Sequence, residues 1–324
     1  MLRKLLARLP RPLRDRVRGA RRDLRRLRYR ARQRRSPVSL DSAALARALG
    51  EAGLAAGDAC FLQASMSSFG GFEAGSATVI DGTRLAVGET GLVAMPAFSL
   101  DASMQAYLER GERFDARATP SRMGRVSEDF RNRPGTRRSI HPTHSVCAAG
   151  VGAGELVAGH ETAITPFGAG TPFTRLAERN AWQLFFGCGT GPMTMYHAFE
   201  CTRRPPFPLP VFSQRVFEIE CVDESGRDLT LRTLAHDPGF VAGRIDSNAA
   251  IQARFRDAIL AGGGHAVELG RGEIIAIRMA DLFAVFERLL DRGETIYERR
   301  LDPERSELTP QERVLGAGIE GSGT

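Results

Sequence analysis

Short apolar segments alternate with predicted helices along most of this chain, and this alternation restricts the fold more than any other feature. The apolar segments are 59–66, 91–99 and 182–189. They run into polar or glycine-rich loops, as buried strands do. The predicted helices are 39–58, 76–88, 245–263 and 279–293. Strands that alternate with helices predict an α/β fold in which helices form layers against the sheet.

Two further patterns refine this prediction. Asp41 or Ser42 is a suitable N-cap for the first helix, and Gly50 or Gly53 lies near its end. Residues 216–234 differ from the rest, because two alternating strands flank a Glu-Ser-Gly-Arg turn. This pattern predicts an antiparallel hairpin in the C-terminal half.

The composition is that of an ordinary globular protein. Its 324 residues are enough for one large domain, and 42% hydrophobic with 26% charged residues is a typical balance. No apolar run approaches the roughly 20 residues that span a bilayer, and the first residues lack the apolar stretch of a signal peptide. The five cysteines are scattered without a C-x-x-C pair. We therefore expect a reduced, cytoplasmic protein without a zinc site.

The net charge of +7 hides a strong asymmetry. Residues 1–35 hold fifteen arginines and Lys4 against Asp15 and Asp23, a net charge of +14, whereas the rest of the chain carries −7. We expect a basic extension at 1–36, a globular domain at 37–310 and a flexible tail at 311–324. The extension is a solvated, partly helical segment, or it binds an anionic membrane surface at the inner face of the membrane. Specific nucleic-acid binding is the weakest alternative, since no nucleic-acid fold is recognisable.

Histidines concentrate in one part of the chain. Four of the six lie between residues 137 and 201, namely His141, His144, His160 and His197. Each stands beside a proline, a glycine or a small polar residue, where catalytic groups often lie. Because imidazole titrates near neutral pH, this cluster predicts an enzyme that transfers protons.

His160 and His197 are the best candidates for a general base. His197 precedes Glu200 by three residues, so the two would share one face of a helix, and a carboxylate raises the basicity of an imidazole. We expect His160 to lie within a few ångströms of His197 or Glu200. His141 and His144 are either functional or ordered loop residues, and we expect His236 and His265 at the surface.

Five long motifs follow one another between Leu40 and Leu290. They are QASMSSFG (63–70), GLVAMPAFS (91–99), the stretch 114–146 that ends in SIHPTHSV, GHETAITPFGAGTPFTRL (159–176) and the segment 187–200 that ends in YHAFE. In this order they resemble the aminoglycoside 3-N-acetyltransferase family. The resemblance implies the antibiotic N-acetyltransferase fold, a layered α/β/α arrangement unrelated to the common GNAT acetyltransferases.

The resemblance also implies an activity. Family members transfer the acetyl group of acetyl-CoA to an amine of an aminosugar in a ternary complex, without a covalent acyl-enzyme. The candidate catalytic residues are His160, His197, Glu200 and Thr194. The candidate acetyl-CoA-binding residues are Ser65, Met66, Ser67, Ser121, Arg122, Met123, His141, Ser145 and Thr171. No metal is expected. The first motif departs from the family, which usually has a His-Ser pair where this chain has Gln63 and Ala64, so the length of the acyl chain stays open.

Charged residues and thiols supply further candidates. A cationic acceptor calls for carboxylates, and the candidates are Glu73, Asp101, Glu128, Asp129 and Glu200. Arg137 and Arg138 either face the phosphates of the donor or belong to a basic surface loop. Cys147 and Cys188 have apolar or glycine neighbours, so we expect them to be packing residues and not nucleophiles.

Three functions remain open at this point. The first is acetyl-CoA-dependent N-acetylation of an aminoglycoside or related aminosugar, a reaction associated with antibiotic resistance. The second is N-acylation of an amino sugar or amine intermediate in the synthesis of a surface glycan or secondary metabolite. The third is an inactive protein that binds membrane or nucleic acid. The sequence leaves the oligomeric state and the acetylated position open.

Overall fold

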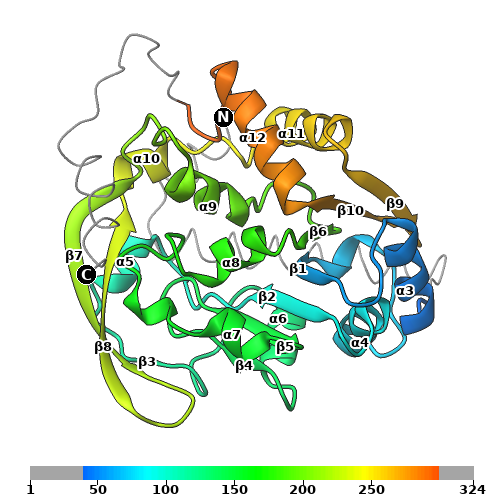
Figure 1. The fold of residues 1–324 in the computed structure, drawn as a ribbon, viewed down its shortest axis with the longest axis horizontal. Coiled ribbons are helices and arrows are strands. Elements are labelled where there is room, and N and C mark those ends of the chain that lie inside the picture. The colour runs from blue at the N-terminus through cyan, green and yellow to red at the C-terminus, as the bar shows by residue number, and fades with distance from the viewer. Residues whose placement is uncertain (1–38, 299–324) are drawn as a thin grey trace, which may run out of the picture.

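A seven-stranded sheet runs through the centre of the computed structural model, which describes residues 39–298 (Figure 1). In spatial order its strands are β4 (Arg137–Arg138), β5 (Val146–Gly150), β2 (Leu92–Pro96), β1 (Ala59–Ala64), β6 (Trp182–Phe186), β10 (Gly272–Arg278) and β9 (His265–Leu269). The central strands β2, β1 and β6 are parallel, whereas the outer strands pair antiparallel. The expected buried strands thus form the middle of a mixed sheet.

Helices cover both faces of this sheet. On one face lie α7 (Ala153–Val157), α8 (Pro172–Glu178), α9 (Thr194–Thr202), α11 (Ala249–Ala261) and α12 (Met279–Asp291). On the other lie α3 (Ser42–Glu51), α4 (Ser76–Val87) and α6 (Arg125–Arg131). Side chains of a strand alternate between the faces, so Phe61 belongs to the first core while Cys60 and Leu62 belong to the second. The expected α/β/α layering is confirmed.

A second, three-stranded sheet forms one edge of the molecule. Its order is β3 (Phe114–Asp115), β7 (Phe212–Val222) and β8 (Asp228–His236), and α5 (Met104–Leu108) packs on it. β7 and β8 are the expected antiparallel hairpin. The hairpin follows the left edge in Figure 1, and α10 (Pro238–Ala242) begins directly after it.

Local sequence signals explain several element boundaries. The Asp41 side chain accepts a hydrogen bond from the backbone N–H of Ala44 at the start of α3, as an N-cap does. Asn248 caps α11 in the same way. The short helical turns η1 (Met66–Ser68) and η2 (His160–Thr162) were not expected from the sequence.

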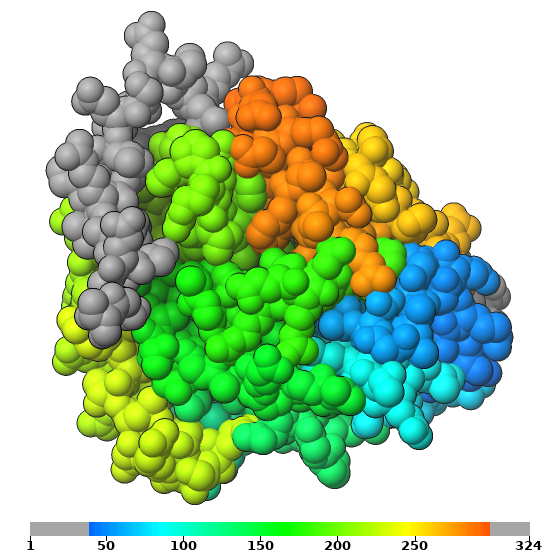
Figure 2. Space-filling model, viewed as in Figure 1, coloured from blue at the N-terminus to red at the C-terminus, as the bar shows by residue number. Residues whose placement is uncertain are grey.

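The parallel strands bring the central motifs together. β1 runs into Ser65 and the η1 turn, and β6 runs into the glycine-rich stretch that leads to α9. Ligand sites of open α/β sheets lie beyond the carboxyl ends of such strands. Figure 2 shows the green segments that follow β5 at the centre of one face, between the hairpin and the N-terminal helices. Among residues 39–298, no helix is long and apolar enough to cross a bilayer. The expected extension at 1–36 and tail at 311–324 lie outside the described residues.

Candidate active site

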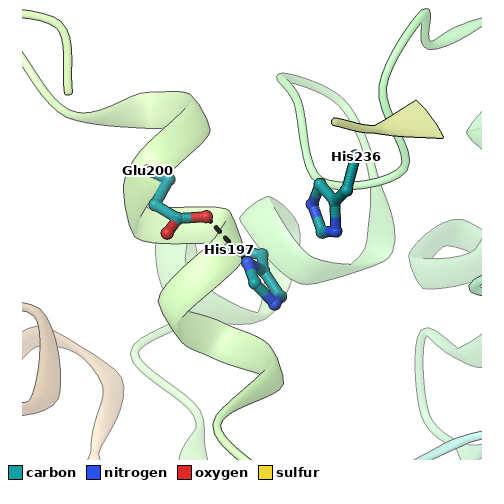
Figure 3. Close-up of side chains that lie close together, drawn as sticks. All are labelled: His197, Glu200 and His236. Carbon is teal, nitrogen blue, oxygen red and sulfur yellow. Dashed lines mark hydrogen bonds and ion pairs between the residues drawn. The ribbon is translucent and has the colours of Figure 1, made fainter. Parts of the chain in front are cut away.

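Helix α9 presents a buried histidine–carboxylate pair. His197 Nδ1 lies 2.7 Å from Glu200 Oε2, one helical turn further on (Figure 3). The expected shared face of the helix is confirmed. Because a carboxylate only accepts when ionised, the bond places the imidazole hydrogen on Nδ1 and leaves the lone pair on Nε2.

Burial controls the charge of both partners. The exposed fractions of His197 and Glu200 are 4% and 5%. Burial lowers the pKa of His197 well below its ordinary value and raises the pKa of Glu200 to about 7. The Tyr297 hydroxyl donates to Glu200 Oε1 at 2.8 Å, which favours the ionised carboxylate. The imidazole is therefore neutral, and its Nε2 carries no proton.

His236 is the third member of this cluster, and the expectation that it lies at the surface is wrong. It ends β8, is 6% exposed, and its ring centre lies 4.5 Å from that of His197. Figure 3 shows its ring turned toward the helix that carries the pair. Its Nε2 atom is buried without a hydrogen-bond partner among the described residues. The expected exposure of His265 is confirmed.

His160 lies in a separate set of contacts. Its Nε2 lies 2.9 Å from the carbonyl oxygen of Pro166, so Nε2 donates, and Nδ1 then accepts from Ser139 Oγ at 2.9 Å. His141 stacks on it at 4.7 Å between ring centres. Among the described residues, no hydrogen bond or ring contact joins His160 to His197 or Glu200. His236 is instead the histidine whose ring contacts that of His197.

Aromatic contacts connect the two groups of histidines. The Phe167 ring touches the rings of His144, His197 and His236, with ring centres 4.7, 5.2 and 5.9 Å apart. His141 and His144 are both buried and share hydrogen bonds with Thr143. Both are thus ordered residues of the buried HPTHS loop.

Thr194, at the start of α9, is anchored to the central sheet. Gln63, at the end of β1, donates to Thr194 Oγ1 at 3.0 Å and accepts from Gln183 Nε2 at 3.1 Å. All three side chains are buried. Since Thr194 Oγ1 accepts from Gln63, its own hydroxyl hydrogen remains available to another acceptor.

Six of the candidate donor-binding residues fall into two places. Ser65 and Ser67 lie beyond β1, with their hydroxyl oxygens 3.2 Å apart, and Met66 lies between them. The second place is the loop of Ser121, Arg122 and Met123, where the Arg122 N–H bonds the carbonyl of Phe98. The Phe98 ring in turn contacts His144, with ring centres 4.4 Å apart. The second place is thus connected to the histidine cluster through Phe98.

Two further candidates, Thr171 and Ser145, make structural contacts. The Thr171 hydroxyl donates to the Gly168 carbonyl before α8, and the Ser145 hydroxyl donates to the Ala97 carbonyl. For Arg138 neither expectation, contact with the donor phosphates or a place in a basic surface loop, matches the structure. Its side chain is 3% exposed and hydrogen-bonds Ser145, Ser99 and nearby carbonyls. Arg137 is exposed and pairs with Glu224.

The structure also gives the partners of three acidic candidates and the surroundings of the thiols. Asp101, Glu128 and Asp129 each pair with an arginine, respectively Arg110, Arg131 and Arg125. Burial raises the pKa of the Cys147 and Cys188 thiols to about 12, which disfavours their thiolates. The expectation that neither cysteine is an activated nucleophile agrees with this chemistry.

Taken together, the fold and the site define a layered α/β protein with a buried histidine–carboxylate pair beyond the carboxyl ends of its central strands. The profile of the family described as aminoglycoside 3-N-acetyltransferase matches residues 61–291. The chain belongs to this family.

Relatives and solved structures agree with this assignment. Aminoglycoside N(3)-acetyltransferase III of Salmonella sp is 31% identical over 176 residues, covering 50% of this chain and 61% of the relative. The chain thus spans about three fifths of that relative's length. The structure of aminoglycoside acetyltransferase AAC(3)-Xa shares the fold, with a TM-score of 0.69, 23% identity and coverage of 86% of this chain and 100% of that chain. The structure of AAC-IIIb with CoASH has a TM-score of 0.64 and 26% identity, covering 79% and 97%.

Proposed function

We propose that this protein transfers the acetyl group of acetyl-CoA to an amine of an aminoglycoside or related aminosugar. The main observation behind this proposal is the buried His197–Glu200 pair at the carboxyl edge of the sheet. Family membership supports the reaction class, and the similarity to AAC-IIIb, whose structure holds CoASH, supports the donor.

In this proposal His197 is the general base, and the geometry favours it over His160. Its Nε2 lone pair is left free by the Nδ1 bond to Glu200, whereas both ring nitrogens of His160 are engaged. Nε2 accepts a proton from the acceptor nitrogen as that nitrogen attacks the thioester carbonyl carbon. When the tetrahedral intermediate collapses, the C–S bond breaks, the CoA sulfur receives the proton held by His197 Nε2, and the base is regenerated.

The tetrahedral oxyanion needs a hydrogen-bond donor. Thr194 is the proposed donor, because Gln63 occupies its oxygen as an acceptor and leaves its hydrogen free. Ser65 and Ser67 beyond β1 are proposed to contact the pantetheine arm, and the loop 121–123 to border the donor. Direct transfer is favoured over an acyl-enzyme because burial disfavours the Cys147 and Cys188 thiolates.

One variant pair tests the assignment of the base. We expect His197→Gln to lower kcat by about 10²–10⁴ with little change in the KM for acetyl-CoA, the usual contribution of general-base catalysis. The loss should shrink at high pH, where the acceptor amine is deprotonated without help. Thiol release from acetyl-CoA in the presence of a panel of amines measures the rate.

His160→Gln is the matched control for this experiment. We expect it to lower thermal stability and to weaken both substrates together, because it removes two buried hydrogen bonds. If His160→Gln abolishes turnover in a stable protein while His197→Gln retains it, His160 is the base. If the wild type releases no thiol with any amine of the panel, the third possibility, an inactive binding protein, is supported.

A smaller amino sugar is a second candidate acceptor, and one observation favours it. Three of the carboxylates expected to face a polycation are already paired with arginines, and Glu200 is held by His197 and Tyr297. A multiply charged aminoglycoside would find few free carboxylates among these residues. Comparing kcat/KM for monosaccharide amines with that for gentamicin and apramycin separates the two acceptors.

A further inference from the structure

The cluster formed by His197, Glu200 and His236 has the composition of a transition-metal site. Each residue offers a ligand atom, and these atoms lie within 4.8 Å of one another. All three side chains are buried, and they come from two elements distant in sequence, α9 and the end of β8. Two imidazoles and one carboxylate match the ligand sets of zinc sites that keep a fourth position open.

A second observation points to a ligand at the same place. His236 Nε2 is buried and has no hydrogen-bond partner among the described residues, and its ring faces the His197–Glu200 pair (Figure 3). Leaving a buried polar atom without a partner is unfavourable. A cation bound between the three residues would coordinate His236 Nε2.

The surroundings also suit a bound cation. Metal-ligating groups are commonly held by an outer hydrogen bond, and Tyr297 supplies one to Glu200 Oε1. The neighbouring guanidinium of Arg244 is paired with Asp246 at 2.5 Å, so it adds no unbalanced positive charge. Tetrahedral ligands of zinc lie about 3.4 Å apart, so the His236 side chain needs to move by about 1 Å to close the site.

We propose that His197, Glu200 and His236 form a binding site for a divalent transition-metal ion such as Zn²⁺, and that the bound ion inhibits the enzyme. Coordination of either nitrogen of His197 removes the base. At Nε2 the ion occupies the lone pair, and at Nδ1 it displaces the hydrogen and leaves Nε2 protonated. Hard cations such as Mg²⁺ prefer oxygen ligands and are excluded by the two imidazoles. Metal binding is measured directly, so it does not rest on the proposed reaction.

The test uses full-length protein freed of metal with a chelator that is then removed. We expect Zn²⁺ to bind one ion per chain at micromolar concentration in calorimetry, and Mg²⁺ not to bind. Co²⁺ should give the visible absorption of a tetrahedral nitrogen- and oxygen-ligated ion, without thiolate charge-transfer bands. Wild-type protein that binds no Zn²⁺, or that binds it with a thiolate spectrum, would overturn the proposal.

Variants assign the site to these residues. His236→Phe keeps an aromatic ring in the packed cluster and Glu200→Gln keeps the side-chain shape, and each should weaken Zn²⁺ binding at least tenfold to hundredfold. The exposed His265→Asn is the matched control and should bind as the wild type does. Thermal melting shows that each variant is folded. Unchanged affinity in both folded site variants would show that the ion binds elsewhere.

Inhibition of thiol release by Zn²⁺, reversed by chelator, is the second readout. Binding without inhibition would overturn the inhibitory role alone.

Discussion

At the scale of single residues, the buried histidines differ in what their hydrogen bonds allow. Both ring nitrogens of His160 make hydrogen bonds, one with Ser139 and one with the Pro166 carbonyl. His160 thus connects the loop that follows η2 to Ser139, which lies just before the HPTHS segment. In His197, by contrast, Nδ1 is bonded to Glu200. In the sequence His160 and His197 are equal candidates for the base, and their different hydrogen-bond partners in the fold distinguish them.

This difference predicts how stability depends on pH. Burial lowers the pKa of His160 to about 3, whereas an unfolded histidine has a pKa near 6.5. Between these values the unfolded chain binds more protons, so the free energy of unfolding falls as pH falls, by up to about 1.4 kcal/mol per pH unit for this residue. We expect the slope between pH 6 and pH 4, from urea unfolding, to decrease in His160→Asn. The exposed His265→Asn should leave the slope unchanged; an equal change in both variants would contradict the assignment.

The local part of the site could be predicted from the sequence, and the long-range part could not. His197 and Glu200 share one helix, so their spacing alone predicts their contact. His236 reaches them only because β8 pairs with β7, with Phe212 opposite His236, and because the hairpin packs beside α9. No local sequence pattern around His236 indicates this packing, so the sequence analysis expected the residue at the surface.

At the scale of helices and strands, the strongest periodic patterns were the ones predicted correctly. The helices α3, α4, α11 and α12 and the strands β1, β2 and β6 follow from the apolar patterns. The strands β9 and β10 were missed. β9 is largely exposed, and β10 gains its place only by pairing with β6 across the sheet. Their assignment depends on tertiary contacts more than on local preference.

One hydrogen-bonded junction joins these elements, and it yields a stability prediction. Gln63→Leu at the end of β1 should remove a buried hydrogen bond from Thr194 and one of the two that Gln183 Nε2 donates, since the other goes to the Leu184 carbonyl. A buried polar group that loses its partner costs about 1–3 kcal/mol, so the free energy of unfolding should fall by at least about 1 kcal/mol. Urea denaturation measures the change. Gln105→Leu, at an exposed hydrogen bond to Glu109, is the control and should change it little. A similar loss in both variants would show that the junction adds no stability.

At the scale of the whole molecule, the charge of the chain is divided. Every residue of the candidate active site lies within the described residues 39–298, in the part of the chain that carries net negative charge. The net charge of +14 belongs to residues 1–35, outside the described region. Catalysis and any attraction to an anionic surface are therefore expected to be separable functions of one chain.

Deletion of residues 1–35 tests this separation. We expect the truncated protein to keep kcat/KM for acetyl transfer within a few-fold, because it retains His197, Glu200 and Thr194. Binding to vesicles that contain anionic lipid should fall sharply, since each basic residue near such a surface contributes about 1 kcal/mol. For the full-length protein this binding should weaken as salt is raised, and vesicles of neutral lipid serve as the control. A truncated protein that melts as the full-length chain does but cannot turn over would place the extension in the reaction. Equal vesicle binding by both proteins would instead remove the extension from any role at the membrane.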